Sequence, residues 1–396
     1  MKFSKSSQLF LVSSIGLLVA SLLAACSVAT IDYVFVTSAP SSVTGQIYTF
    51  DADSESGALR SGPAAVSSGG IDPVAMAVTS DYANLYVANA GNSTTTGTVV
   101  HFTIGSNGVL TQQNDTITFS LNDAPVALAV NSAGTYLYVV SGTTSATLRE
   151  YALSAGTISS ATPVKQALTV SSHTLVPTGI AVLVNTSTVS GNGVYVTAYD
   201  QSASSGKIFG FTVGSTGALT PATGSPYAAG VKPSGIASTP TDLYLYVTDY
   251  ANNQLIGYSI LSTGQLNLLG GTATTATGDE PSALAIDPRG LFVYVSNAGE
   301  PSTVSAYGIT LASGALTAVV NSIGNTDTKP VAIAVDPALG RFVFTANYLG
   351  SSLSGFRLNS TSGALTTTQG TPYTTPDPTA LVIVPHGNHA TQSVSP

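Results

Sequence analysis

Charged residues that directly precede a proline are the first candidates for chemistry in this sequence. Only 8% of the 396 residues are charged, yet five of the seven prolines that recur about every fifty residues directly follow a charged residue. These charged residues are Asp72, Lys232, Glu280, Lys329 and Asp377. The last four alternate in sign, an arrangement suited to a polar, roughly neutral molecule such as a sugar. The plainer interpretation is a solvated rim whose charges form weak pairs.

Two tyrosines add to this set of candidate ligand-binding residues. Tyr250 comes after Lys232, and Tyr348 after Lys329, each at the end of the second strand of its repeat. Their rings could stack on a ligand. The corresponding positions Ala124 and Val176 are uncharged and apolar. We therefore predict a binding site with its charges gathered on one side.

Histidine supplies a weak candidate for catalysis. His173 lies four residues before Pro177. It is the best single acid–base group because imidazole titrates near neutral pH. His101 is expected within a strand as a structural or exposed residue. His386 and His389 fall in the C-terminal tail, where we allow only a weak adventitious metal contact.

No metal site or cofactor is predicted. A zinc site needs three or four ligands, and their pattern is not visible here. Asp51, Asp53 and Glu55 resemble an oxygen-rich calcium loop only in part, and the equivalent hairpin of the last repeat has no carboxylates. A plain turn is the favoured interpretation. The sequence contains no Gly-x-Ser-x-Gly elbow and no P-loop.

A sevenfold repeat indicates which elements position these residues. A complete copy has a proline-led apolar strand, a second strand rich in Tyr and Val, a third strand and a Gly-x-Leu or Gly-x-Ile ending. The prolines are Pro73, Pro125, Pro177, Pro233, Pro281, Pro330 and Pro378. Short strands in units of about fifty residues are typical of propeller blades. We predict an all-β fold, a seven-bladed β-propeller with four antiparallel strands per blade.

The two ends of the repeat complete each other. The first unit lacks a proline-led strand, and the strand that starts at Pro378 has no partners after it. The C-terminal strand should therefore be the innermost strand of blade one, which closes the ring and removes an exposed sheet edge. Along each inner strand a small residue alternates with a large one, so we expect both faces to be buried between neighbouring blades.

The N-terminus reads as an export signal. A basic start with Lys2 and Lys5 precedes an apolar stretch that ends in Leu-Ala-Ala-Cys, and Cys26 is the only cysteine. This ending resembles the lipobox of bacterial lipoproteins, which implies a lipid on Cys26 and, with Ser27 next, the outer membrane where one exists. We predict a signal peptide over 1–25, a propeller over 26–385 and a tail over 386–396.

Charge limits the partners. Loss of the two signal lysines takes the net charge from −8 to −10. Nucleic-acid binding depends on neutralising phosphates with Lys and Arg, so it is not expected. We expect a monomer in the cell envelope, attached to the membrane through Cys26, with a carbohydrate-like ligand or an envelope protein as partner.

The blade phrase from Pro281 to Asn297 resembles the lactonase-type propellers related to 6-phosphogluconolactonase and carboxy-muconate cyclases. The segment from Tyr246 to Gln254 resembles the repeat of a neighbouring family of surface propellers. Enzymatic members of the lactonase family carry His, Arg and Glu side chains near the starts of the inner strands, so the resemblance implies such residues here if the chain is an enzyme. Here the residues after the prolines are Val74, Val126, Thr178, Ser234, Ser282, Val331 and Thr379. We therefore favour a binding or scaffold module, with a sugar lactonase as the alternative.

Overall fold

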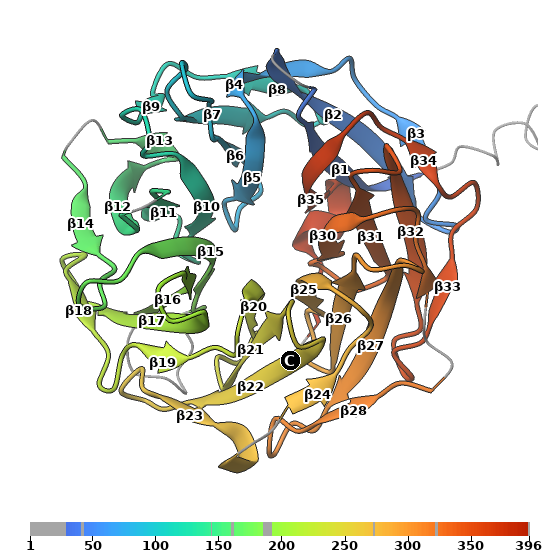
Figure 1. Cartoon of the computed structure of the whole chain (residues 1–396). Coiled ribbons are helices and arrows are strands. Elements are labelled where there is room, and N and C mark those ends of the chain that lie inside the picture. The colour runs from blue at the N-terminus through green and yellow to red at the C-terminus, as the bar shows by residue number, and fades with distance from the viewer. Residues whose placement is uncertain are drawn as a thin grey trace, which may run out of the picture.

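Seven antiparallel sheets stand in a ring around a central axis in the computed structural model (Figure 1). The structure describes residues 29–40, 43–143, 145–159, 162–184, 192–271, 274–320 and 324–394. The predicted all-β, seven-bladed propeller is confirmed.

Each blade begins with an inner strand beside the axis. Six of these strands start at the repeated proline, and the blade-four strand starts two residues earlier. In blade order they are β35 (Pro378–Pro385), β5 (Pro73–Val78), β10 (Pro125–Val130), β15 (Leu175–Val182), β20 (Pro233–Ser238), β25 (Pro281–Ile286) and β30 (Pro330–Val335).

Second and third strands follow outward in each blade. The second strands are β1 (Thr30–Ser38), β6 (Asn84–Asn89), β11 (Tyr136–Ser141), β16 (Asn192–Asp200), β21 (Tyr244–Asp249), β26 (Phe292–Asn297) and β31 (Phe342–Asn347). The third strands are β2 (Thr44–Asp53), β7 (Thr98–Ile104), β12 (Thr147–Ser154), β17 (Ser205–Val213), β22 (Gln254–Ile260), β27 (Thr303–Ile309) and β32 (Ser352–Leu358).

The outermost position of each blade is shared by two short segments, both paired with the third strand. The pairs are β3 (Leu59–Ser61) with β4 (Val66–Ile71), β8 (Leu110–Gln112) with β9 (Ile117–Thr118), β13 (Thr157–Ile158) with β14 (Val164–Ala167), β18 (Leu219–Pro221) with β19 (Tyr227–Ala228), β23 (Leu266–Leu268) with β24 (Thr274–Ala276), β28 (Leu316–Ala318) with β29 (Gly324–Asn325), and β33 (Leu365–Thr367) with β34 (Tyr373–Thr374). Two short 3₁₀ helices, η2 (Leu269–Gly271) and η3 (Gly387–Thr391), complete the described elements.

The chain closes on itself as predicted. Strand β35 pairs with β1 in antiparallel register, with Phe35 opposite Val382 and Tyr33 opposite Val384. The first described strand thus receives its inner neighbour from the far end of the chain.

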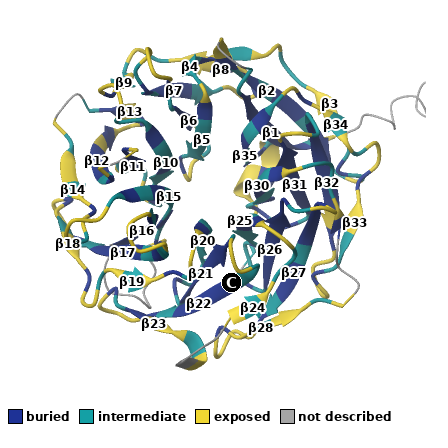
Figure 2. Ribbon diagram, viewed as in Figure 1, coloured by how far each residue is buried: buried dark blue, intermediate teal, exposed yellow. Residues whose placement is uncertain are grey.

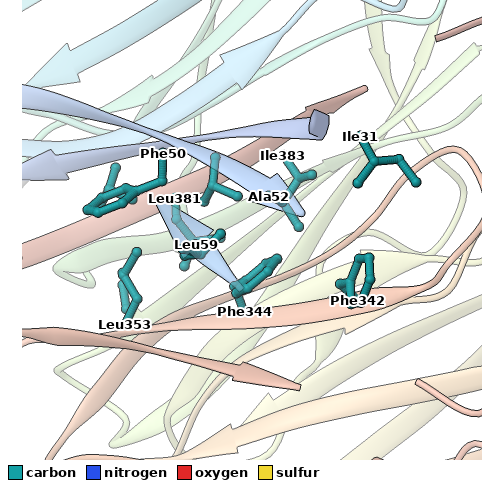
Figure 3. Packing of buried hydrophobic residues seen from close by; sticks show 12 residues of the cluster. Ile31, Phe50, Ala52, Leu59, Phe342, Phe344, Leu353, Leu381 and Ile383 are labelled. Atoms are coloured by element: carbon teal, nitrogen blue, oxygen red, sulfur yellow. The ribbon is translucent and has the colours of Figure 1, made fainter. Parts of the chain in front are cut away.

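The hydrophobic core is divided into seven clusters, each lying where two neighbouring blades meet. Figure 3 shows the cluster where the ring closes: Phe342 and Phe344 of blade seven face Phe50 of blade one and Leu381 of β35. Figure 2 shows that the buried residues run through the blades and that the exposed ones gather at the outer edge. Burial between blades therefore holds the ring together.

The inner strands are less buried than the sequence suggests. Most of their residues are only half-buried, whereas the second strands are almost fully buried. Our expectation that both faces of the inner strands are buried holds only in part. Large residues such as Leu128, Leu284 and Leu381 are buried between blades, whereas most of the small residues that alternate with them are half-buried. Small residues are still needed: a Cβ on Gly235 would lie 3.1 Å from the Ala283 Cα of the next inner strand.

In four blades, a tyrosine hydroxyl of the preceding blade donates a hydrogen bond to the glycine of the Gly-x-Leu or Gly-x-Ile ending. The hydroxyl of Tyr246 donates to the carbonyl of Gly314 in the next blade at 2.7 Å, and Tyr195 does the same to Gly264 at 2.7 Å. Gly314 has a φ of 68°, and a Cβ there would lie 2.4 Å from the ring of Tyr244. Glycine is required because the turn is left-handed and an aromatic ring of the preceding blade lies against it.

Candidate functional site

Loops before the seven prolines and loops after the second strands meet on one face of the ring, which we call the mouth. Backbone hydrogen bonds join them: the Ala90 amide donates to the Asp72 carbonyl at 2.7 Å, and the Tyr250 amide donates to the Lys232 carbonyl at 2.9 Å. The same bond joins Ala298 to Glu280 at 2.9 Å. The residues predicted for binding therefore lie on a single face.

Four of the predicted charged residues have a left-handed backbone. The φ angles are 56° for Asp72, 53° for Glu280, 57° for Lys329 and 39° for Asp377. This conformation costs roughly 1 kcal/mol or more for a residue with a Cβ, so the surrounding loop bonds must hold it. Asp377 is half-buried and the other three are exposed, although desolvation by the loops raises the pKa of Asp72.

Three predicted residues are brought together between blades five and six. The Lys232 Nζ lies 4.8 Å from the centroid of the Tyr250 ring. The hydroxyl of Tyr250 donates a hydrogen bond to Glu280, and this bond, followed by burial, raises the pKa of Tyr250. A cation, an aromatic ring and a carboxylate thus form one cluster at the mouth. Lys329 and Tyr348 form a separate exposed pair in blade seven, linked by a backbone hydrogen bond of 2.9 Å.

His173 has a partner that the sequence reasoning missed. Its Nδ1 lies 2.6 Å from Oδ2 of Asp200, a fully buried carboxylate at the end of β16. Burial works to raise the pKa of Asp200, but the hydrogen bonds from His173 and from the Ser202 and Ala203 amides hold it below its usual value. An imidazole held through Nδ1 presents Nε2 to its surroundings, the arrangement used by histidine bases.

The structure also indicates which sequence signal could have revealed Asp200. Blade four pairs Leu175 with Asp200, two residues before Pro177, so its inner hairpin extends beyond those of the other blades. Among the seven repeated prolines, the interval from Pro177 to Pro233 is the longest. That interval was visible in the sequence, but the His–Asp contact was not.

Residues directly after the prolines join neighbouring blades. Ser282 Oγ donates to the Pro330 carbonyl at 2.7 Å, and Thr379 Oγ1 donates to the Pro73 carbonyl at 2.6 Å. Ser234 makes the same contact to Pro281 at 2.5 Å. These hydroxyls therefore link one inner strand to the next.

Polar residues that end the second strands do not face the mouth. Asp249, Asn297 and Asn347 are fully buried. Asp249 accepts backbone hydrogen bonds from Val231 at 3.0 Å and Lys232 at 2.9 Å. These two bonds fix the loop that carries Lys232. Asn297 and Asn347 instead donate to hydroxyls of the third strands of their own blades.

Two of the other histidines are better anchored than the sequence suggested. His101 is buried and its Nδ1 lies 2.9 Å from Asp115, so the structural role holds, but with a partner. His389 is also buried, with Nε2 3.1 Å from Asp336 Oδ1 and 3.4 Å from Asp32 Oδ1. The segment after the propeller therefore docks against blades one and seven.

The favoured interpretation of the carboxylate-rich hairpin in blade one is a turn, and the contacts agree with it. Asp53 Oδ1 accepts hydrogen bonds from the Glu55 amide at 3.1 Å and from the Ser56 amide at 2.7 Å. A side chain that caps its own turn in this way fixes a tight loop.

Two surface hollows lie elsewhere. One of about 660 Å³ is lined by Asp115, Phe119 and Arg149, and another of about 770 Å³ by Asp279 and Tyr307. Neither is lined by the residues predicted for the mouth. Arg149 pairs with Asp123 at 2.5 Å and lies over the Phe119 ring, which makes it part of the packing there.

The predicted signal peptide and Cys26 lie outside the described residues. Within the part of the chain that the structure describes, no helix is long and apolar enough to cross a membrane.

Comparison with known proteins extends these observations. The family model described as a lactonase, 7-bladed beta-propeller matches residues 33–175, 192–325 and 263–386. A search of curated proteins finds no match.

Several solved structures share the fold. The periplasmic gluconolactonase PpgL of Pseudomonas aeruginosa superposes with a TM-score of 0.70 at 20% identity, covering 90% of this chain and 99% of its own. A candidate 6-phosphogluconolactonase from Bacteroides fragilis gives 0.71 at 17% identity, covering 90% and 99%. A protein from Lactobacillus plantarum gives 0.71 at 18%, covering 90% and 100%. With its repeat, its closed ring and the family model in agreement, the chain belongs to the lactonase family of seven-bladed β-propellers.

Proposed function

We propose that the mouth binds a polar, sugar-like molecule. The observation that carries this proposal is the cluster of Lys232, Tyr250 and Glu280. An aromatic ring offers a flat surface to the face of a sugar, while the ammonium and carboxylate can donate and accept hydrogen bonds to its hydroxyls. Opposite charges in one cluster favour a neutral ligand over a strongly charged one.

Binding can be tested by calorimetry with neutral glucono-1,5-lactone and with gluconate, its charged open form. We expect the lactone to bind more tightly, and the double variant Lys232→Gln, Lys329→Gln to weaken binding at least fivefold. The double variant Arg60→Gln, Lys165→Gln removes the same charge from exposed sites in the outer segments and serves as the control. Equal weakening in both double variants would show that the mouth charges have no specific role.

Lactone hydrolysis is the second candidate function, favoured by the contact between His173 and Asp200. Asp200 holds Nδ1, so Nε2 can accept a proton from water while the water oxygen bonds to the lactone carbonyl carbon. The ring C–O bond then breaks, and the proton returns from Nε2 to the leaving oxygen. Support comes from the family and from the name of the Pseudomonas relative, a periplasmic gluconolactonase.

Turnover separates the two functions. We expect glucono-1,5-lactone to open little faster than it does in buffer alone. Hydrolysis well above this background that falls at least a hundredfold in His173→Ala, and also falls in Asp200→Asn, would replace the binding module with an enzyme. His386→Gln is the control, because it alters a histidine of the segment that docks on blades one and seven. Turnover that survives His173→Ala would place the chemistry elsewhere.

We also propose that the protein is exported and held in the cell envelope by a lipid on Cys26, as a monomer. The basic start, the apolar stretch and the Leu-Ala-Ala-Cys ending at Cys26 support this location. Cys26→Ala should move the protein from the membrane fraction to the soluble fraction. Unchanged membrane association would contradict the anchor.

A further inference from the structure

Three metal-ligating side chains meet where the ring closes, away from the mouth. Asp32 lies in β1 of blade one, Asp336 directly follows β30 of blade seven, and His389 lies in η3. One ligand atom from each falls within 4.8 Å of the others, and all three residues are buried. Residues from both ends of the chain therefore form one cluster.

Asp32 is the residue that points to a ligand. It is fully buried, yet neither of its carboxylate oxygens has a hydrogen-bond partner in the structure. A buried carboxylate without donors is costly, so such groups are normally paired or bound to a metal. His389 Nε2 is 3.4 Å from Asp32 Oδ1, which is close enough to share a ligand.

The other two residues are held in place by the protein. His389 Nδ1 lies 2.9 Å from Gln392 Oε1, which directs Nε2 toward the carboxylates. Metal-binding histidines are commonly oriented by such a second contact. Asp336 accepts backbone hydrogen bonds from Ala338 at 2.9 Å and from Arg341 at 3.0 Å, so its carboxylate is fixed as well.

The separations match those of a compact metal site. His389 Nε2 lies 3.1 Å from Asp336 Oδ1 and 3.4 Å from Asp32 Oδ1. Ligands at 2.0–2.1 Å from a tetrahedral zinc ion are roughly 3.3 Å apart. Calcium takes six to eight oxygen ligands, so one nitrogen and two carboxylates suit it less well.

We propose that Asp32, Asp336 and His389 form a binding site for one divalent transition-metal ion, zinc in the first instance, with a fourth position open to water. The ion joins the first blade, the last blade and the C-terminal segment. Its expected role is to stabilise the closed ring, since a ligand that binds only the folded state raises stability with its concentration.

The test uses the full chain carrying Cys26→Ala, so that the thiol cannot bind metal. After chelator treatment, zinc should bind with a stoichiometry of one and raise the midpoint of thermal unfolding. Co²⁺ should give the intense visible absorption of a tetrahedral site. Asp32→Asn and His389→Gln should each lower the affinity at least tenfold.

His386→Gln is the matched control, because His386 directly precedes η3 and contacts Tyr33 rather than the two carboxylates. It should bind zinc as the parent does. Unfolding midpoints of all variants in chelator show whether each is folded. A folded parent that binds no zinc, or folded Asp32→Asn and His389→Gln variants that bind as the parent does, would overturn the proposal. Loss of binding in His386→Gln alone would identify an adventitious ion only.

Discussion

The mouth and the closure of the ring handle charge in opposite ways. At the mouth, Lys232 and Glu280 are exposed, and each of them contacts Tyr250. At the closure, Asp32 and Asp336 are fully buried beside His389, and burial followed by the charge of Asp336 raises the pKa of Asp32 to about 8. Exposed charges can be exchanged at little cost to the fold, whereas buried ones are tied to it.

The difference follows from which ends of the inner strands are involved. The mouth lies where these strands start, and its loops are fixed by backbone bonds that leave the side chains in solvent. The closure cluster lies where β35 and β30 end, under the docked segment that contains η3. Docking removes water from the carboxylates, so each carboxylate oxygen that lacks a hydrogen-bond partner there destabilises the folded state.

Removal of the closing strand should have the largest effect. A chain ending at Asp377 loses β35, including Leu381, Ile383 and Val384, which are all buried. Burial of each of these side chains contributes about 1.5–3 kcal/mol to the free energy of unfolding, so losing all three removes much of the stability of a typical domain. We expect a failure to fold, measured by circular dichroism and size-exclusion chromatography.

A chain ending at His386 is the comparison for that truncation. It keeps β35 and loses only the segment after His386, which contains η3 and His389. It should remain folded with a lowered midpoint of thermal unfolding. Equal stability of the two truncated chains would contradict closure by β35.

Glu150 tests buried charge in a different part of the ring. It lies in β12, is 3% exposed, and burial raises its pKa to about 7 from 4.5, although a hydrogen bond with Tyr138 lowers it in part. The folded state therefore keeps a proton that the unfolded state releases above pH 4.5. Stability from this group is present below pH 4.5 and is lost as the pH rises through 7.

Glu150→Gln should remove this dependence. Relative to the parent, the variant should gain stability between pH 5 and 8, by up to about 3 kcal/mol. Urea unfolding across that range measures the difference. Glu280→Gln removes a carboxylate from the exposed mouth and serves as the surface control, for which we expect no comparable gain in stability. Parallel profiles for Glu150→Gln and the parent would mean that Glu150 is not desolvated in solution.

A pair of tyrosines provides the smallest and most direct comparison. Tyr246→Phe removes a buried hydroxyl that donates to Gly314 in the next blade, leaving that carbonyl without this donor. We expect a loss of about 1 kcal/mol in the free energy of unfolding. Tyr250→Phe, at the mouth, should change it by less than about 0.5 kcal/mol. If both variants lose the same stability, the mouth is as tightly packed as the space between blades.

Much of the architecture could be predicted from the sequence because local, repeated sequence patterns determine it. The spacing of the prolines, the Tyr-Val strands and the unmatched strand at Pro378 predicted seven blades and their closure. The same repeat placed Asp72, Lys232, Glu280, Lys329 and Asp377 on one face. These features depend only on alternation along a strand and on turn residues, both readable without knowing what lies opposite.

Contacts between distant segments were decided by the tertiary structure alone. His173 contacts Asp200 because the inner hairpin of blade four is two residues longer than its counterparts. His389 contacts Asp32 only because the C-terminal segment docks on the first blade. Repeat alignment could not show either contact, since both residue pairs break the repeat. Burial likewise depends on which blades come together. His389, in the predicted tail, is therefore buried, whereas most residues of the inner strands are half-buried.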